Sequence, residues 1–324
     1  MIVPEFWSEA KERVILDGRS LTFTRFGWSD VSEEEALRNA TDRVAEAAAR
    51  ARTGESVRLK DHKVSYNGSE GLPIREEIVE KHGDAVITRN GYGALCLNTP
   101  DVLFADVDVS TEPRYNLLGW VLYVAVLYFA IEQKGFFGPW WPVILAGVVS
   151  PLFVWPIARA IVKVVGKFRA DPFRKALLRI EDYSLRNPSW LIRVYRTPNG
   201  FRLLVMHDTF SPEQEPAFQF MQAIHGDSLY EMMCRNQKCF RARISPKPWR
   251  LGVDRLRQRG VWPISPERIS DRRAWVEDYS AKSLGYASCR FEKTIGNGVP
   301  HKKCEMIRKV HDEYSRADSD LPIA

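Results

Sequence analysis

Two aspartates, Asp106 and Asp108, stand two residues apart near the end of the segment LFADVDVS, residues 103–110. If residues 102–109 form a strand, its period of two puts both carboxylates on one face. Neighbouring carboxylates repel each other unless they are solvated or share a cation, and Mg²⁺ or Mn²⁺ is commonly held by one or two carboxylates together with substrate phosphates. The pair therefore predicts a Mg²⁺ or Mn²⁺ site that takes a phosphate-bearing ligand. The competing interpretation is a pair of solvated turn acids.

Basic side chains further along the chain could hold such phosphates. The segment FRARISPKPWR, residues 240–250, combines arginines and a lysine with Trp249, which suits phosphates and stacking on a nucleobase. The segment HGDSLY, residues 225–230, offers a third acid. The candidate phosphate-binding residues are Arg202, Arg243, Lys247 and His207, and the candidate third acid is Asp227. For each basic residue the alternative is a solvated strand edge or a lipid-facing charge.

The elements that must position these residues lie on both sides of a long apolar region. Before it, the hydrophobic periodicity and the turn residues predict a strand at 19–28, a helix from the Ser32–Glu35 capping box to Gly54, a short helix near 74–81, and strands at 84–90, 94–99 and 102–109. After it, they predict a helix at 171–187 with Asp171 as its cap, strands at 189–196 and 201–207 joined by the tight turn TPNG, a helix from about 212, a strand at 240–245, and a final helix near 303–315. Strands interleaved with helices predict an α+β fold, with a mixed or antiparallel sheet and flanking helices, or an α/β fold.

The apolar region itself predicts a transmembrane helical hairpin over residues 115–162. Residues 115–131 and 136–158 carry no charge; the second run is long enough to cross a hydrocarbon core of about 30 Å, and the first is near the lower limit. Lysines and arginines follow the second run, so the positive-inside rule places both flanks, and both termini, on the cytoplasmic side of the inner membrane. The alternative is a buried helical hairpin within a soluble domain.

The bulk composition is compatible with a membrane-anchored domain that binds phosphates. The 324 residues carry a formal net charge of +6, which fits nucleotides, nucleic acid or an anionic lipid surface, or simply a mixed surface with a basic collar. The five cysteines include no CxxC pair and follow no secretory signal, so we expect them to be reduced. The expected organisation is two halves of a cytoplasmic domain, 1–110 and 170–250, around the hairpin at 115–162, with a basic extension at 251–324.

The order of these motifs resembles the archaeo-eukaryotic primase superfamily, which includes the primase-polymerases. The resemblance is carried by FADVD (104–108), TPNGFR (197–202), Asp227 and RARISPK (241–247). It implies a primase-polymerase-like core and a two-metal nucleotidyl-transfer site, in which Asp106, Asp108 and Asp227 hold metal and Arg202, Arg243 and Lys247 hold phosphates. Leu203 stands where the family has a histidine, a departure that puts polymerisation in doubt, and His207 could substitute for it. The segment ITRNGYGALCLNT, residues 87–99, also resembles segments of uncharacterised bacterial two-span membrane proteins, which implies no activity.

Three functions therefore remain open at the level of sequence. The first is a membrane-anchored cytoplasmic domain that binds nucleotide or nucleic acid through a metal–carboxylate site, with or without nucleotidyl transfer. The second is a membrane-associated glycosyltransferase of the GT-A type, which also uses Asp-x-Asp to hold Mn²⁺ and a sugar nucleotide. Residues 1–100 lack the run of parallel, Val- and Ile-rich strands that such an enzyme needs. The third is a non-catalytic, membrane-tethered interaction protein.

Overall fold

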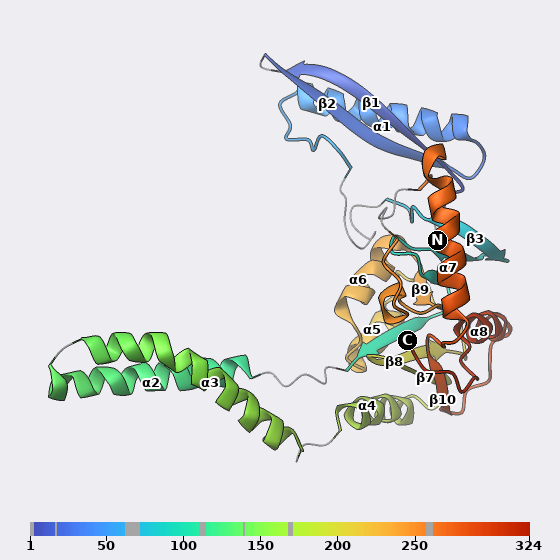
Figure 1. Cartoon of the computed structure of the whole chain (residues 1–324). Coiled ribbons are helices and arrows are strands. Elements are labelled where there is room, and N and C mark those ends of the chain that lie inside the picture. Colours follow the sequence, from blue (N-terminus) through green and yellow to red (C-terminus); the bar gives the residue numbers. More distant parts are fainter. Residues whose placement is uncertain are drawn as a thin grey trace. The chain divides into compact units, whose positions relative to one another are not determined.

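A computed structural model describes residues 3–16, 18–61, 72–109, 115–138, 140–167, 171–256 and 262–324 (Figure 1). The chain divides into two compact units, one built from residues 1–108 and 179–324 and the other from residues 109–178. Within the described residues there are eight α-helices and three sheets whose paired strands all run antiparallel. The predicted α+β class with antiparallel sheets is confirmed.

The N-terminal part of the larger unit is a two-stranded ribbon with a helix packed against it. Strands β1 (Phe6–Leu16) and β2 (Arg19–Ser29) pair along their full length, and helix α1 (Glu33–Arg52) follows. The Ser32 hydroxyl accepts a hydrogen bond from the Glu35 N–H at 3.2 Å, so the predicted cap is confirmed. Gly27 allows close packing of ribbon and helix, because a Cβ there would lie 2.1 Å from the Ala40 nitrogen.

A four-stranded sheet in the order β3-β4-β5-β9 comes next. Its strands are β3 (Glu77–His82), β4 (Ala85–Arg89), β5 (Leu95–Thr99) and β9 (Phe240–Arg243). The short helix expected near 74–81 is wrong, because residues 77–82 form β3. Gly83, with φ +64°, turns the chain directly into β4, and the hairpin pairing satisfies the backbone groups that a helix would have paired internally.

The other four-stranded sheet has the order β10-β7-β8-β6. Strands β7 (Ile192–Thr197) and β8 (Gly200–Val205) form the predicted hairpin at the centre of the sheet. Strands β6 (Phe104–Asp108) and β10 (Arg290–Ile295) are the two edge strands of the sheet. Residues from both sides of the apolar region meet in this sheet, since β6 pairs with β8 in a register that places Asp106 opposite Arg202. This pairing determines the geometry of the candidate site.

Five further helices lie after the apolar region, and the chain belongs to the larger unit from residue 179 onward. They are α4 (Pro172–Arg186), α5 (Glu215–Ala223), α6 (Ser228–Gln237), α7 (Ile269–Ser283) and α8 (Lys302–Ser315), with single 3₁₀ turns at η1 (Pro248–Arg250) and η2 (Pro266–Arg268). The Asp171 carboxylate accepts a hydrogen bond from the Phe173 N–H at 3.0 Å, at the predicted start of α4. The sequence analysis predicted α4, α5 and α8 but neither α7 nor β10.

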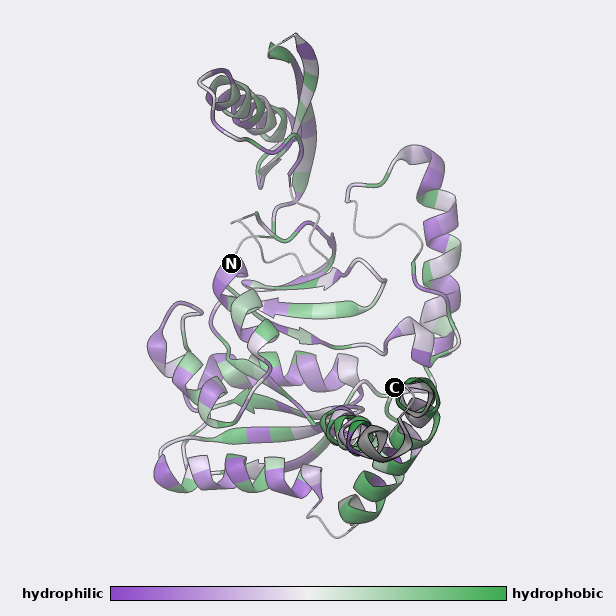
Figure 2. Ribbon diagram, turned by 90° about the vertical axis from the view of Figure 1, so that its left-hand side faces the viewer, coloured by the Kyte–Doolittle hydropathy of each residue, from purple (hydrophilic) through white to green (hydrophobic). Residues whose placement is uncertain are grey.

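The smaller unit contains two apolar helices, α2 (Asn116–Phe137) and α3 (Trp141–Lys167), which are hydrophobic over most of their length (Figure 2). They contact each other: the Tyr123 hydroxyl donates to the Gly147 carbonyl at 3.3 Å, and the Trp120 and Trp155 rings lie 5.3 Å apart. Within the described residues, Val143–Val165 is the one helical segment long and apolar enough to span a membrane, and only 11% of its apolar stretch is buried. The apolar stretch of α2, Asn116–Glu132, is shorter, so the second span stays a prediction.

Candidate functional site

The site begins with Asp106, which is paired with a buried arginine. In the side chain of Arg202, Nε and Nη2 donate to the two carboxylate oxygens of Asp106 at 2.8 and 3.0 Å. The Arg202 side chain is only 3% exposed, whereas that of Asp106 is 33% exposed. Burial opposes the charge of Arg202, but the ion pair with Asp106 raises the pKa of the guanidinium above its ordinary value. Arg202 therefore holds Asp106 in place and is itself withdrawn from solvent.

The third predicted acid, Asp227, lies beside Asp106. Its backbone N–H donates to the Asp106 carbonyl at 2.9 Å, and its side chain caps α6 by accepting from the Leu229 N–H at 2.9 Å. One turn further along α6, the Tyr230 hydroxyl donates to the Phe104 carbonyl at 3.1 Å. The start of α6 thus covers the open edge of β6 and brings a third carboxylate to the strand that carries the acid pair.

Asp108, at the end of β6, is exposed and interacts with both other acids. Partial burial and then the charges of Asp106 and Asp227 raise its pKa above the ordinary value, although Lys247 and Arg243 oppose this shift. The three predicted acids therefore lie close enough to repel one another. Within the described residues, no group of three or more His, Cys, Asp or Glu side chains has an arrangement that would hold a metal by itself. A bound cation would need oxygen atoms from its ligand or from water as well.

Three cations lie near enough to these acids to interact with their charges: Arg243 at the end of β9, Lys247, and Arg250 in η1. Burial and then the charges of Arg243 and Arg250 lower the pKa of Lys247 to about 8. The Arg243 Nε and the Arg250 Nη1 are buried and have no hydrogen-bond partner among the residues that the structure describes. Buried N–H donors without partners are costly, so this cluster has an unmet need for acceptor atoms.

Other residues that the sequence analysis did not single out complete the cluster. The side-chain Oδ1 of Asn199 accepts a hydrogen bond from the Arg250 Nη2 at 2.8 Å. The Tyr92 hydroxyl interacts electrostatically with Arg243, and the Tyr92 ring lies 5.2 Å from that of Trp249. Tyr92 is presented by a tight loop in which the Asn90 side chain accepts from the Tyr92 N–H at 3.2 Å. The only sequence signal for this arrangement is the Asn-Gly dipeptide of the loop.

The side chains of His207 and Leu203, which the sequence analysis discussed together with the site, form no hydrogen bond with the acidic or basic group within the described residues. His207 follows the end of β8, where its ring lies 4.7 Å from that of Trp190 and 5.6 Å from that of Phe210, and burial lowers its pKa. Leu203, at the position of the family's histidine, is fully buried and paired with Ala105. The predicted phosphate-binding set therefore separates into Arg243 and Lys247, which share a cluster, Arg202, which pairs with Asp106, and His207, whose contacts are aromatic.

A second group of reactive residue types lies in the core. The Cys289 Sγ is 3.9 Å from the His311 Nε2, and the His311 Nδ1 is 3.0 Å from the Asp312 Oδ1. Burial disfavours a thiolate, but His311 lowers the pKa of Cys289 below its ordinary value. Such a chain of residues can activate a nucleophile, yet Cys289 and His311 are both 0% exposed, so a substrate does not reach the sulfur. We assign this group a structural role.

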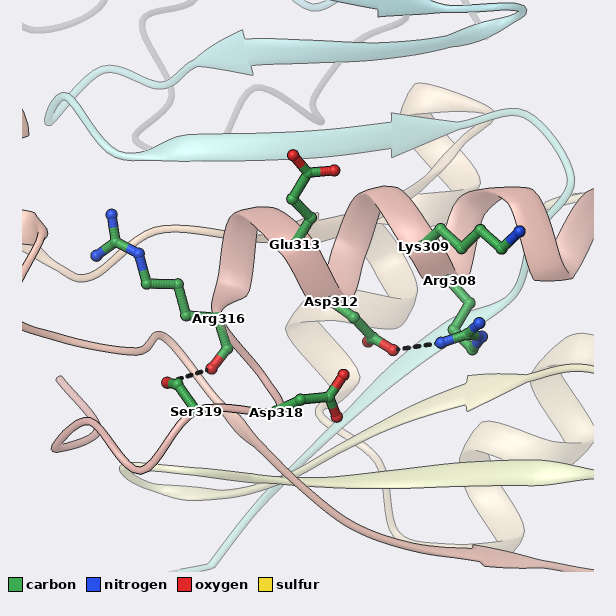
Figure 3. Close-up of a pocket in the computed structure, with 7 residues that line it drawn as sticks. All are labelled: Arg308, Lys309, Asp312, Glu313, Arg316, Asp318 and Ser319. Atoms are coloured by element: carbon green, nitrogen blue, oxygen red, sulfur yellow. Dashed lines mark hydrogen bonds and ion pairs between the residues drawn. The ribbon is translucent and has the colours of Figure 1, made fainter.

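A surface groove of about 510 Å³ lies along α8 and the residues that follow it (Figure 3). Its lining residues are Arg308, Lys309, Asp312, Glu313, Arg316, Asp318 and Ser319. The groove mixes acids with bases, and Arg308 is already paired with Asp312 at 3.0 Å. None of the residues predicted for phosphate or metal lines it.

Comparison of the chain with models of protein families, with curated proteins and with solved structures found no match. The resemblance to the primase superfamily therefore depends on the motifs alone and stays a prediction.

Proposed function

We propose that the larger unit binds a phosphate-bearing ligand together with a divalent cation, and that the ligand is a nucleotide or a nucleic acid. The observation that carries this proposal is that an acidic group and a basic group lie close enough to interact. The acidic group is Asp106, Asp108 and Asp227, and the basic group is Arg243, Lys247 and Arg250. Each group is internally repulsive, and the two groups are near enough to influence each other's ionisation. In a Mg²⁺– or Mn²⁺–phosphate complex, the cation would compensate the negative charge of the acids and the phosphate would compensate the positive charge of the bases.

The geometry favours Asp108 and Asp227 as the residues that approach the cation. Both oxygens of Asp106 already accept hydrogen bonds from Arg202, so this carboxylate serves first to neutralise a buried guanidinium. Asp108 is exposed. Asp227 caps α6 through its Oδ1, which leaves its Oδ2 to approach a cation. Two carboxylates together with ligand phosphates and water form an ordinary Mg²⁺ environment.

The basic group suits the phosphates of the same ligand. The unpartnered Arg243 Nε and Arg250 Nη1 are donors for phosphate oxygens, and Lys247 adds a point charge. Trp249 is 41% exposed, with the Lys247 Nζ 5.4 Å from its ring centroid, so an aromatic surface lies next to the phosphate donors. This combination favours a ligand that carries a base as well as phosphates.

Nucleotidyl transfer is the reaction that the family resemblance implies, and it belongs to this proposal as a second step beyond binding. Leu203 points into the core, so the chain presents no histidine to a ligand from that position. His207 does not compensate, because it packs between Trp190 and Phe210. Ligand binding is therefore the function with the stronger support.

The membrane location is part of the same proposal. The exposed apolar surface of α3 favours a lipid environment for Val143–Val165, and we extend this to two spans through α2, with both flanks in the cytoplasm of a bacterial-type inner membrane. Asp108 is only eight residues before Asn116, the first residue of α2. The candidate site would thus lie close to the inner leaflet.

A thermal-shift panel on detergent-solubilised, full-length protein tests the binding. We expect ATP or a short oligonucleotide to raise the melting temperature, and Mg²⁺ or Mn²⁺ to add a further increment that Asp108→Asn removes. The matched controls are Asp278→Asn and Lys282→Met, which break an exposed ion pair on α7. The absence of any shift, or an unchanged metal increment in Asp108→Asn, would contradict the proposal. Mn²⁺-dependent binding of sugar nucleotides alone would favour the glycosyltransferase alternative.

A further inference from the structure

Helix α4 has an exposed face that combines leucines with basic residues. Ala176, Ile180 and Ser184, at intervals of four, form its buried face. Leu178 and Leu185 lie seven residues apart, hence on one line along the opposite face, and are 52% and 82% exposed. Two single exposed leucines on a helix surface would need no explanation by themselves, so the residues around them decide whether this face binds anything.

The surroundings are basic. Arg174 and Lys175 are exposed and form no ion pair within the described part of the chain, whereas Arg186 is paired with Asp182. In the sequence, the preceding end of α3 adds Arg159 and Lys163. Leucines flanked by uncompensated cations are the pattern of a helix that lies in a membrane interface and attracts anionic headgroups.

The chain itself limits how far α4 can be from such an interface. The candidate span Val143–Val165 is 23 residues long, or about 34 Å of helix, so its ends reach the headgroup level of a bilayer with a core of about 30 Å. Helix α3 ends at Lys167 and α4 begins at Pro172. Five Cα–Cα steps cover at most about 19 Å, which keeps the first turn of α4 near the headgroups.

We propose that the face of α4 that carries Leu178 and Leu185 lies on the cytoplasmic membrane surface and binds anionic lipid headgroups through Arg174 and Lys175. The inference depends on the proposed membrane location of α3 but not on the proposed ligand site. The bilayer is favoured over a protein partner because the helix is covalently connected to the candidate span and because the exposed Arg174 and Lys175 have no ion-pair partner among the described residues. Such a contact would hold the domain against the inner leaflet rather than leave it on a free tether.

The test uses full-length protein in lipid nanodiscs with a fluorophore at position 185. Leu185→Cys is labelled with an environment-sensitive dye, while the five native cysteines are all buried. Leu284→Cys, at the end of α7, is the matched control because Leu284 is a leucine of 65% exposure. We expect spin-labelled lipids to quench the dye at 185 in anionic discs, to quench it at least twofold less in zwitterionic discs, and to leave the dye at 284 unaffected.

Two further measurements distinguish a failure of the proposed lipid contact from a failure of the membrane span. Arg174→Gln with Lys175→Gln should abolish the difference between anionic and zwitterionic discs without changing incorporation. Absence of quenching at 185 in protein that is stably incorporated, or quenching that ignores lipid charge, would overturn the inference while leaving the membrane span intact. Protein that does not incorporate without detergent would instead overturn the span, and self-quenching between labelled copies in place of lipid quenching would indicate a second copy on this face.

Discussion

Lys247 makes the proposed ligand site sensitive to pH. Burial, Arg243 and Arg250 lower its pKa from 10.5 to about 8, so about nine-tenths of the free protein carries the ammonium at pH 7 and about one-tenth at pH 9. Asp108 and Asp106 act on Lys247 in the opposite direction. The arginines stay charged across this range, and burial raises the pKa of Tyr92 above 10.0. The ionisation of Lys247 therefore dominates the response of the basic group between pH 7 and pH 9.

If the ammonium contacts a phosphate, the affinity for ATP with Mg²⁺ should fall about tenfold between pH 7 and pH 9, or about 1.4 kcal/mol. The terminal phosphate, with a pKa of about 6, changes little over the same range. Isothermal titration calorimetry at several pH values measures this slope. Lys247→Arg should keep the affinity and flatten the slope, Lys247→Met should weaken binding at pH 7, and Lys282→Met should match the unmodified protein. A slope that survives in Lys247→Arg would refute the reasoning.

The same shift has a consequence for stability. The folded pKa of Lys247 lies below its unfolded value, so folding disfavours the charged form: the cost is present below pH 8 and disappears as the pH rises from about 8 to 10.5. This difference in pKa between the unfolded and the folded state corresponds to at most about 3.4 kcal/mol, which solvent screening of this partly exposed group reduces to about 1 kcal/mol. Lys247→Met should therefore raise the free energy of unfolding at pH 7 by about this amount while weakening the ligand.

Three further predictions concern the site's buried ion pair and the packing of the rest of the fold. Asp106→Asn should lower the free energy of unfolding in urea by about 3 kcal/mol, because it leaves Arg202 charged and buried, whereas Asp108→Asn should be neutral or slightly stabilising; equal losses would contradict the different roles assigned to the two acids. Cys289, despite its lowered pKa, should resist a thiol reagent in the native protein and react fully in denaturant, and rapid native labelling of this residue would refute its structural role. Gly27→Ala should destabilise the protein by about 2–3 kcal/mol through a clash with the α1 backbone, while Gly285→Ala, with no atom within 4 Å of the added Cβ, should not.

Local signals in the sequence predicted many of the elements. The Ser32–Glu35 box, the Asp171 cap and the TPNG turn each specify a boundary by short-range hydrogen bonding or turn chemistry, and the structure has those boundaries. Strand β1 gave no such signal, since only Trp7 and Val14 of its 11 residues are buried. Strand β10 is a partly exposed edge with little apolar alternation. Elements that bury little apolar surface show little hydrophobic periodicity, so the sequence does not predict them.

The candidate site shows the same limit at longer range. The period of two in β6 was sufficient to place Asp106 and Asp108 together. The pairing of Asp106 with Arg202 depends on the β6–β8 register between residues 96 positions apart, and a shift of one residue would turn Arg202 to the other face. Arg250 in η1, Asn199 in the β7–β8 turn and Tyr92 in the β4–β5 loop come together only through tertiary packing, and no spacing in the sequence predicts it.

The ion pair of Arg202 and Asp106 explains why the two aspartates of the Asp-x-Asp motif have different roles. In β6, the inner carboxylate neutralises a buried guanidinium, which also donates to the Arg243 carbonyl and so connects the β6–β8 pair to the end of β9. The outer carboxylate, Asp108, has no such partner within the described part of the chain, and partial burial together with the charges of Asp106 and Asp227 raises its pKa. Asp108 is accessible to solvent, and its charge is disfavoured by the neighbouring acids. A bound cation would remove this repulsion, so the free energy released would contribute to ligand binding.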